Sequence, residues 1–210
     1  MAQPSDDRAK TDKPTWDERF SVAHYVFGEA PNLFLSRQLA ILPKAGRVLC
    51  VSDGEGRNGV WLAEQGLDVV STDFSPEAQK KARALAAKRG VSITTELADM
   101  INYDWPYAAY DVVVAIFIQY TGPADRALMF EGMLRALKPG GLFLLQGYTT
   151  RQPAYGTGGP PQLENLYTRE ILEGLLAPLS RVEIKQYDEE IDEGDRHNGL
   201  SALIDAVGYK

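Results

Sequence analysis

Cysteine and histidine are scarce in this chain of 210 residues, which contains one cysteine and two histidines. The single cysteine, Cys50, excludes an intrachain disulfide. No group of His, Cys, Asp and Glu has the spacing of a structural zinc site, so we expect no bound metal. The Gly-x-Ser-x-Gly pattern of serine hydrolases is also absent, which argues against that mechanism.

Long apolar runs and basic blocks are missing as well. No stretch approaches the length of a membrane span, and the first residues lack the apolar region of a signal peptide. A net charge of −7 without any Lys/Arg-rich block opposes binding to nucleic acid or to an anionic membrane. We therefore expect a cytoplasmic protein with a small-molecule partner, and the composition leaves both a monomer and a dimer open.

What the chain does contain is a regular alternation of apolar segments. Runs rich in β-branched residues predict strands at residues 47–51, 67–73, 91–95, 111–117, 142–146, 181–187 and 202–209. Apolar periodicity and capping residues predict helices at residues 31–42, from 60 onward, and at 75–90, 130–137 and 168–176. This order predicts an α/β, Rossmann-like doubly wound fold. Its sheet is seven-stranded and mainly parallel, with a final antiparallel strand and helices on both faces.

The domain organisation follows from changes in composition along the chain. Residues 1–14 are polar, charged and interrupted by proline, which predicts a disordered lead-in. Residues 15–210 are expected to form a single domain. Within it, the aromatic-rich residues of about 15–32 precede the core, and the Gly/Pro-rich residues of about 148–166 form an insert after the fifth strand. We expect these two segments to close over a site at the ligand-binding edge of the sheet.

The glycine-rich run after the first strand is the most informative local motif. Residues 54–59 read Gly-x-Gly-x-x-Gly between a strand and a helix, the arrangement in which α/β folds hold nucleotide-like ligands. Gly54 and Gly56 allow the backbone to approach a ligand closely. A turn that only closes a strand–helix unit is the simpler interpretation.

Two carboxylates inside this turn bear on the ligand. Asp53 and Glu55 would repel a pyrophosphate at the helix N-terminus, which otherwise attracts anions. The sulfonium and ammonium groups of S-adenosylmethionine would be attracted instead. The turn therefore favours S-adenosylmethionine over NAD.

With these elements in place, the chain resembles a class I S-adenosylmethionine-dependent methyltransferase over residues of about 15–210. The motifs that carry the resemblance are the turn at 54–58, Asp73 at the end of the second strand, Ala98-Asp99-Met100, and Leu137-Lys138-Pro139-Gly140-Gly141 before the fifth strand. The last of these is the most discriminating, because a nicotinamide-binding domain has no reason to place it there.

Within that class, the Gly-x-Gly-Arg-Asn turn is similar to that of the tellurite-resistance and thiopurine-methyltransferase-like group. The N-terminal pattern of this group is matched by Trp16-Asp17, Tyr25, Gly28 and Pro31-Asn32. The chain departs from the group at Cys50 and Ser52, where an acidic residue and a glycine are usual. This departure shifts part of the recognition of the methionine end to Asp53, Glu55 or the N-terminal segment.

The resemblance implies methyl transfer from S-adenosyl-L-methionine to a small soft nucleophile: a thiol, a selenium or tellurium oxyanion, or a halide. Such an acceptor is already anionic and needs little acid–base help. A neutral amine or hydroxyl would make Tyr120 or His197 the first candidate base. An NAD-dependent oxidoreductase, or a module that binds S-adenosylmethionine without catalysis, stays open as an alternative.

Individual residues can be given expected roles. Asp73 ends the second predicted strand, where a carboxylate can accept hydrogen bonds from both ribose hydroxyls. Asp99 is expected to accept from the adenine amino group. The full set expected at the cofactor is Trp16, Tyr25, Asp53, Gly54, Glu55, Gly56, Asn58, Asp73, Phe74, Asp99, Met100, Ala115 and Ile116. The set expected at the acceptor is Phe20, Gln119, Tyr120, Tyr155 and His197.

Overall fold

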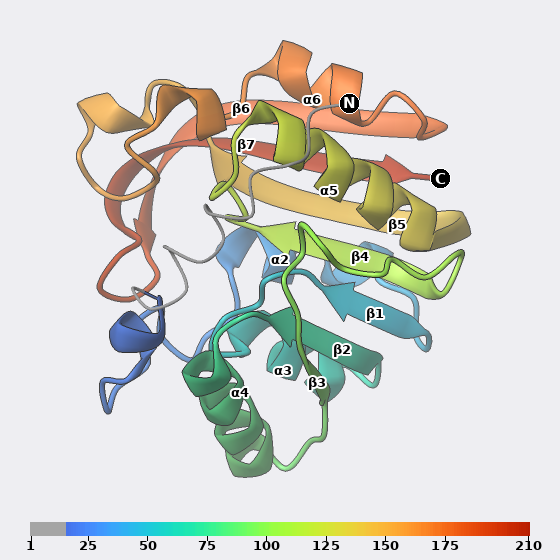
Figure 1. Ribbon diagram of the computed structural model, residues 1–210, viewed down its shortest axis with the longest axis vertical. Coiled ribbons are helices and arrows are strands. Elements are labelled where there is room, and N and C mark those ends of the chain that lie inside the picture. Colours follow the sequence, from blue (N-terminus) through green and yellow to red (C-terminus); the bar gives the residue numbers. More distant parts are fainter. Residues whose placement is uncertain (1–15) are drawn as a thin grey trace.

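A computed structural model describes residues 16–210 of the chain, so the predicted lead-in at residues 1–14 lies outside the described residues. A seven-stranded sheet with strand order β3-β2-β1-β4-β5-β7-β6 runs through the molecule (Figure 1). The strands from β3 to β5 are mutually parallel, whereas β7 runs antiparallel to both β5 and β6. This architecture confirms the predicted fold class.

The strands are β1 (Arg47–Cys50), β2 (Asp68–Asp73), β3 (Thr94–Leu97), β4 (Tyr110–Ile116), β5 (Leu137–Tyr148), β6 (Arg181–Asp192) and β7 (Asn198–Tyr209). The helices are α2 (Leu33–Arg37), α3 (Arg57–Glu64), α4 (Pro76–Arg89), α5 (Pro123–Ala136) and α6 (Arg169–Leu175). Short 3-10 turns lie at η1 (Leu39–Ile41), η2 (Gln152–Ala154) and η3 (Leu163–Asn165). Residues 16–20 are also helical. None of the helices in this described part of the chain has the length and hydropathy of a membrane span.

Helix α4 begins and ends where the sequence predicts. The Ser75 side chain caps its first turn by accepting a hydrogen bond from the backbone N–H of Ala78. Pro76 occupies the first helical position, where its missing N–H costs nothing. Gly90 ends the helix in the left-handed conformation, with φ +70°.

Three expectations about element bounds are wrong. The predicted helix at 31–42 is interrupted at Gln38, between α2 and η1, and η1 ends at Ile41 because Pro43 holds Leu42 in an extended conformation. The residues Leu137–Gly141 belong to β5 itself, where Leu137 pairs with Tyr110 across an irregular register. Strand β6 continues to Asp192 and strand β7 begins at Asn198, so both are longer than the predicted strands at 181–187 and 202–209.

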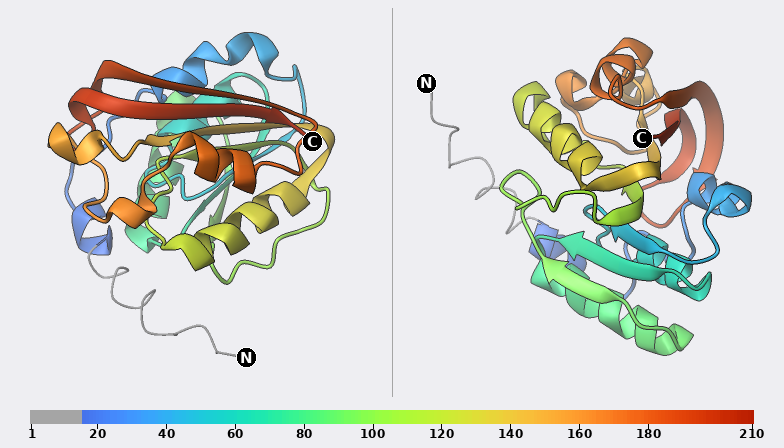
Figure 2. Two further views of the ribbon diagram at one scale, coloured as in Figure 1. Left: turned by 90° about the horizontal axis from the view of Figure 1, so that it is seen from above. Right: turned by 90° about the vertical axis from the view of Figure 1, so that its right-hand side faces the viewer.

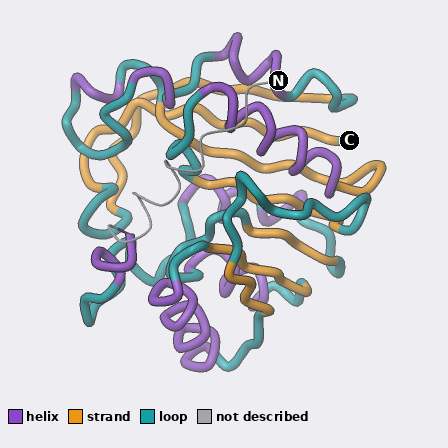
Figure 3. Tube along the Cα trace, in the orientation of Figure 1, coloured by secondary structure: helices purple, strands orange, loops and turns teal. Residues whose placement is uncertain are grey.

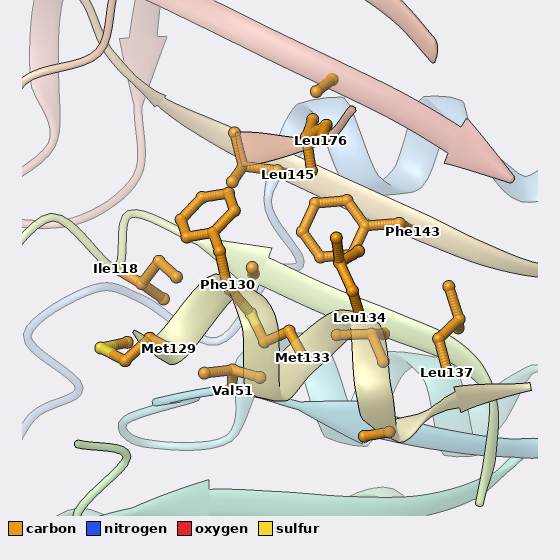
Figure 4. Close-up of a cluster of buried hydrophobic side chains, with 14 of the residues drawn as sticks. Val51, Ile118, Met129, Phe130, Met133, Leu134, Leu137, Phe143, Leu145 and Leu176 are labelled. Carbon is orange, nitrogen blue, oxygen red and sulfur yellow. The ribbon is translucent and has the colours of Figure 1, made fainter. Parts of the chain in front are cut away.

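Helices lie on both faces of the sheet, as the two views of Figure 2 show, and a cluster of buried apolar side chains lies on each face. Side chains alternate along the buried strand β4, so that Val113 and Ala115 face one layer and Val112 and Val114 face the other. The first layer is covered by α5 and α6. Figure 4 shows Phe130 and Met133 of α5 against this face, with Phe143, Leu145 and Leu176 nearby. Helices α2 and α3 cover the second layer.

Candidate active site

Three segments far apart in the sequence gather at the carboxyl ends of the parallel strands. They are the N-terminal segment (residues 16–32), the insert (residues 148–166) and the β6–β7 connection (residues 193–197), all on the left of Figure 1. Figure 3 shows that most of this region is loop with short helical turns. Ligands of open α/β sheets bind at this edge, so it is the place to look for a site.

The glycine turn after β1 uses its two glycines for different purposes. Gly56 caps α3 with φ +84°, and a Cβ there would lie 2.6 Å from the Cβ of Ala82 on α4. Gly56 therefore lets α3 and α4 pack together. Gly54 has φ +60°, and a Cβ there would meet only the ring of Phe20, at 3.5 Å. Gly54 therefore faces the N-terminal segment.

The carboxylate of Asp53 is folded back into the turn. Its Oδ2 accepts hydrogen bonds from the backbone N–H of Gly59 at 3.1 Å and from the hydroxyl of Ser71 at 2.8 Å. Burial raises the pKa of Asp53 to about 7, although these hydrogen bonds oppose the change. Asp53 also lines a cavity of about 90 Å³ together with Trp16, Phe27 and Ile116.

Glu55 and Asn58 attach the N-terminal segment to the turn. The Oε1 of Glu55 pairs with the Nζ of Lys81 at 2.7 Å, and its Oε2 accepts from the backbone N–H of Phe27 at 3.2 Å. The Oδ1 of Asn58 accepts from the backbone N–H of Asn32 at 2.9 Å. Both oxygens of Glu55, expected to attract a cationic ligand, are thus engaged within the protein, although the residue still lines the small cavity.

Asp73 stands at the end of β2, between the turn and the start of α4. Its two carboxylate oxygens accept from the backbone N–H groups of Gly54 and Ser75, both at 2.9 Å. Burial raises its pKa to about 6, against the effect of these donors. The residue is therefore fixed in place by its neighbours, with its carboxylate at the sheet edge where the ribose acid is expected.

The loop after β3 lies beside Asp73. Asp99 accepts from the backbone N–H of Ile101 and from the side chain of Asn102, and it lines an open cavity of about 550 Å³. Met100 is buried, with its sulfur 3.4 Å from the hydroxyl of Thr72. Phe74 is half-buried.

Two residues without glycine's freedom adopt left-handed backbone conformations at adjacent strand ends. Ser52 follows β1 with φ +49°, and Phe117 follows β4 with φ +54°. Such strain costs about 1–3 kcal/mol per residue and is typical of functional sites. The hydroxyl of Ser52 lies 2.7 Å from that of Tyr120, so a hydrogen bond joins the two strand ends. A glycine at position 52 would adopt this conformation without strain.

A large cavity of about 650 Å³ opens at this edge. It is lined by Trp16, Arg19, Phe27, Phe117, Gln119, Tyr120, Gly122, Tyr148, Gly158–Gln162, Glu164, Asn165, Arg196 and His197. The imidazole of His197 packs between aromatic rings, with its centroid 4.7 Å from Phe27 and 4.2 Å from Phe117. Burial, followed by the charge of Arg57, lowers the pKa of His197 to about 3. The ring is therefore neutral at physiological pH.

Not every expected residue reaches this cavity. The hydroxyl of Tyr155 donates to Asp188, and the insert contributes residues 158–162 to the lining instead. Phe20 is buried beneath Trp16, and the hydroxyl of Tyr25 donates to the backbone of Lys81.

The remaining expected residues stand close to the strand ends. Gln119 lines the cavity, and its amide also exchanges hydrogen bonds with the backbone of Tyr148. Ala115 is buried in the core, and Ile116 lines the small cavity.

A buried ion pair that the sequence did not indicate joins α3 to the β6–β7 connection, which in turn contacts the N-terminal segment. The Nη2 of Arg57 lies 2.6 Å from the Oε2 of Glu193 in the β6–β7 connection. Glu193 also accepts from the side chain of Asn32 and from the backbone N–H of Leu33. The two members of the pair are 136 positions apart. No local pattern could have identified it, because a glutamate in a polar connection looks like any exposed residue.

Comparison with known proteins adds to this geometry. Residues 48–141, which include the glycine turn, Asp73 and the Leu137–Gly141 element, match the family described as a methyltransferase domain. Over these residues the chain is similar to the class I S-adenosylmethionine-dependent methyltransferases. The matched residues run from β1 into β5 and thus contain the cofactor-side half of the site.

Sequence relatives of this chain are distant. It is 31% identical over 128 residues to the demethylmenaquinone methyltransferase of Deinococcus radiodurans, covering 60% of this chain and 51% of that protein. It is 26% identical over 129 residues to the 2-heptyl-1-hydroxyquinolin-4(1H)-one methyltransferase of Mycobacteroides abscessus, covering 60% and 57%. The chain therefore spans about half the length of the curated relatives it matches.

Solved structures extend the similarity to nearly the whole fold. TehB from Haemophilus influenzae superposes with a TM-score of 0.69 at 18% identity, covering 84% of this chain and 61% of TehB. NodS from Bradyrhizobium japonicum, an N-methyltransferase in complex with S-adenosylhomocysteine, superposes with a TM-score of 0.67 at 17% identity, covering 94% of this chain and 97% of NodS. A structure described under the conversion of a disulfide bond into a thioacetal group during echinomycin biosynthesis superposes with a TM-score of 0.77 at 17% identity. It covers 95% of this chain and 91% of that chain. At such identities these structures show the fold.

Proposed function

We propose that the protein transfers the methyl group of S-adenosylmethionine to a small acceptor that attacks as a soft, already anionic nucleophile. The candidates are a thiol, a selenium or tellurium oxyanion, or a halide. The observation that carries this choice is the unsuitability of both candidate bases. Burial raises the pKa of Tyr120, so its phenolate is not accessible, and the pKa of His197 at about 3 makes its ring a weak proton acceptor. An anionic nucleophile needs neither of them.

The residues present fit the cofactor. The buried carboxylate of Asp73 is proposed to accept from the ribose hydroxyls, and Asp99 with Met100 to contact the adenine. The small cavity combines acids with the aromatic faces of Trp16 and Phe27, which suits a sulfonium through cation–π attraction. When bound, S-adenosylmethionine supplies an electrophilic methyl group whose carbon–sulfur bond breaks as the bond to the nucleophile forms.

The chain's own contribution is alignment and exclusion of water. We propose that the N-terminal segment (about 15–32) and the insert (about 148–166) act as the two halves of a lid. In support, Trp16 and Phe27 from the first and Gly158–Gln162 from the second line the same cavity. His197 and Tyr120 are proposed to orient the acceptor through neutral hydrogen-bonding groups.

Calorimetry with S-adenosylmethionine, S-adenosylhomocysteine, NAD and NADP tests the cofactor first. We expect binding of the first two with affinities on the order of micromolar, worth about 8 kcal/mol, and no comparable binding of NAD or NADP. Methyl transfer to a panel of thiols, selenite, tellurite and iodide then tests the acceptor. Tight cofactor binding with no transfer to any of them, but with transfer to amines or hydroxyls, would refute the soft-nucleophile proposal.

A further inference from the structure

The large cavity gathers positive charge in a chain whose net charge is −7. Among the described residues that line it, the charged ones are Arg19, Arg196 and Glu164. Arg19 belongs to the N-terminal segment and Arg196 to the β6–β7 connection. These two segments meet directly, because the backbone N–H of Asp195 donates to the carbonyl of Val26 at 2.8 Å. Two guanidinium groups on one cavity of an acidic protein indicate an anionic ligand.

The side chain of Arg19 is oriented by stacking on an aromatic ring. Its guanidinium carbon lies 4.1 Å from the ring centroid of Trp16, which in turn stacks on Phe20 at 5.4 Å. Stacking fixes the plane of a guanidinium while its N–H donors stay free at the edge. Within residues 16–210, neither Arg19 nor Arg196 forms an ion pair with a carboxylate.

The two guanidinium groups also influence each other. Burial, and then the charge of Arg196, lowers the pKa of Arg19, so the groups lie close enough to repel. An anion that contacts both relieves this repulsion. A carboxylate matches the planar fork of an arginine better than a spherical halide does, because two parallel N–H donors meet its two oxygens.

The rest of the cavity suits an organic body. The rings of Phe27, Phe117 and Tyr148 surround His197, and they offer apolar faces to a planar group. The buried Nδ1 of His197 and Oδ1 of Asn165 form no hydrogen bond within the described chain, which leaves them for a ligand. A volume of about 650 Å³ also exceeds what a halide or an oxyanion fills, and lies within the range of pockets for organic ligands.

We propose that Arg19 and Arg196 bind the carboxylate of an organic acceptor whose planar apolar body lies against the aromatic walls of the large cavity. This inference rests on the proposed function and narrows its acceptors to organic acids that carry the nucleophilic atom, rather than inorganic ions. The arginines recognise the acceptor, and they take no part in holding the cofactor.

A pair of matched probes tests the inference without relying on turnover. Calorimetry measures the binding of para-mercaptobenzoate and of its neutral amide to the protein loaded with S-adenosylhomocysteine. We expect the carboxylate to bind at least about tenfold more tightly than the amide, because hydrogen bonds to charged groups are worth roughly 1.5–3 kcal/mol. Arg196→Gln and Arg19→Gln should each remove most of this preference.

The controls separate the inference from the proposed function. Arg135→Gln removes the same charge from the exposed surface of α5, outside the cavity, and should change neither probe's affinity. Affinity for S-adenosylhomocysteine should stay unchanged in Arg196→Gln, whose wild-type side chain is exposed. Equal binding of the two probes by the wild-type protein would overturn the inference. So would a loss of S-adenosylhomocysteine affinity in Arg196→Gln as large as its loss of affinity for the carboxylate probe. A wild-type protein that fails to bind S-adenosylhomocysteine would instead overturn the proposed function.

Discussion

The two halves of the site are built in different ways. The proposed cofactor half consists of the turn after β1, the end of β2 and the loop after β3, and hydrogen bonds from backbone N–H groups hold it together, such as that from Gly54 to the carboxylate of Asp73. The acceptor half is assembled from residues 16–32, 117–122, 148–165 and 193–197, which are distant in the sequence. Its integrity depends on a few side-chain contacts between loops, above all those of Glu193.

This difference has a physical consequence. A half-site built on adjacent strand ends keeps its shape as long as the sheet is folded. One that depends on a few side-chain contacts between distant loops can change with a single substitution. The cofactor half therefore suits a ligand that is common to the family, and the acceptor half suits specificity that varies between members.

The largest effect is expected from Glu193→Ala. This change leaves the buried guanidinium of Arg57 without its carboxylate, and breaking a buried pair in this way costs about 3–5 kcal/mol. Glu183→Ala is the matched control, because it breaks only an exposed pair with Lys185, worth about 0–1 kcal/mol. Urea denaturation measures both. Equal, small losses in the two variants would show that Glu193 does not hold the acceptor half.

Gly56→Ala tests the rigidity of the cofactor half. A left-handed backbone costs a side chain roughly 1–2 kcal/mol. The contact at 2.6 Å from Ala82 adds about 1–3 kcal/mol of overpacking. Gly90→Ala is the control, since Gly90 has φ +70° but no atom within 4 Å of an added Cβ. We expect a greater loss of unfolding free energy at Gly56 than at Gly90. Similar losses would mean that the packing of α3 on α4 is not what requires glycine.

The local structure around the proposed cofactor half is the part that the sequence predicts well, for a reason these two variants illustrate. Its determinants are local: β-branched runs, positive φ at Gly56, and the cap at Ser75 leave traces in neighbouring residues. Glu193, whose contacts hold the acceptor half together, leaves none, because its partners come from elsewhere in the chain. Apolar periodicity also predicted the wrong end for the helix at 31–42, because Pro43 keeps Leu42 out of any helix.

Asp73→Asn tests the proposed ribose contact. Loss of a charged acceptor of hydrogen bonds is worth about 1.5–3 kcal/mol, so S-adenosylhomocysteine should bind roughly 10- to 150-fold more weakly. Calorimetry measures the affinity, and circular dichroism checks that the variant is folded. A folded variant with wild-type affinity would exclude Asp73 from the ribose site.

The pH dependence of the same residue separates its effects on stability and on binding. Burial raises the pKa of Asp73 to about 6, so the folded state holds this proton more tightly than the unfolded state does. The contribution of Asp73 to stability is therefore fully present below about pH 4 and is lost as the pH rises through about 6. Cofactor affinity should change in the opposite direction, rising by up to about tenfold per pH unit below 6, because the ionised form is the better acceptor. Stability and cofactor affinity are measured against pH in wild type and in Asp73→Asn, and the difference between the two proteins gives the contribution of Asp73. Identical pH profiles in the two proteins would contradict the raised pKa of Asp73 and its proposed contact with the ribose.

The smallest effect concerns Ser52, where the two halves touch through its hydrogen bond to Tyr120. Ser52→Ala loses this bond, worth about 0.5–1.5 kcal/mol, and keeps the strain of φ +49°. Ser52→Gly loses the same bond but removes strain of roughly 1–2 kcal/mol, offset by about 0.5–1 kcal/mol of added freedom in the unfolded chain. The glycine variant should therefore be at least as stable as the alanine variant, and within about 1 kcal/mol of wild type. Tyr120→Phe in both backgrounds should cost nothing further if the bond is already absent. A glycine variant clearly less stable than the alanine variant would show that the backbone at Ser52 is not strained.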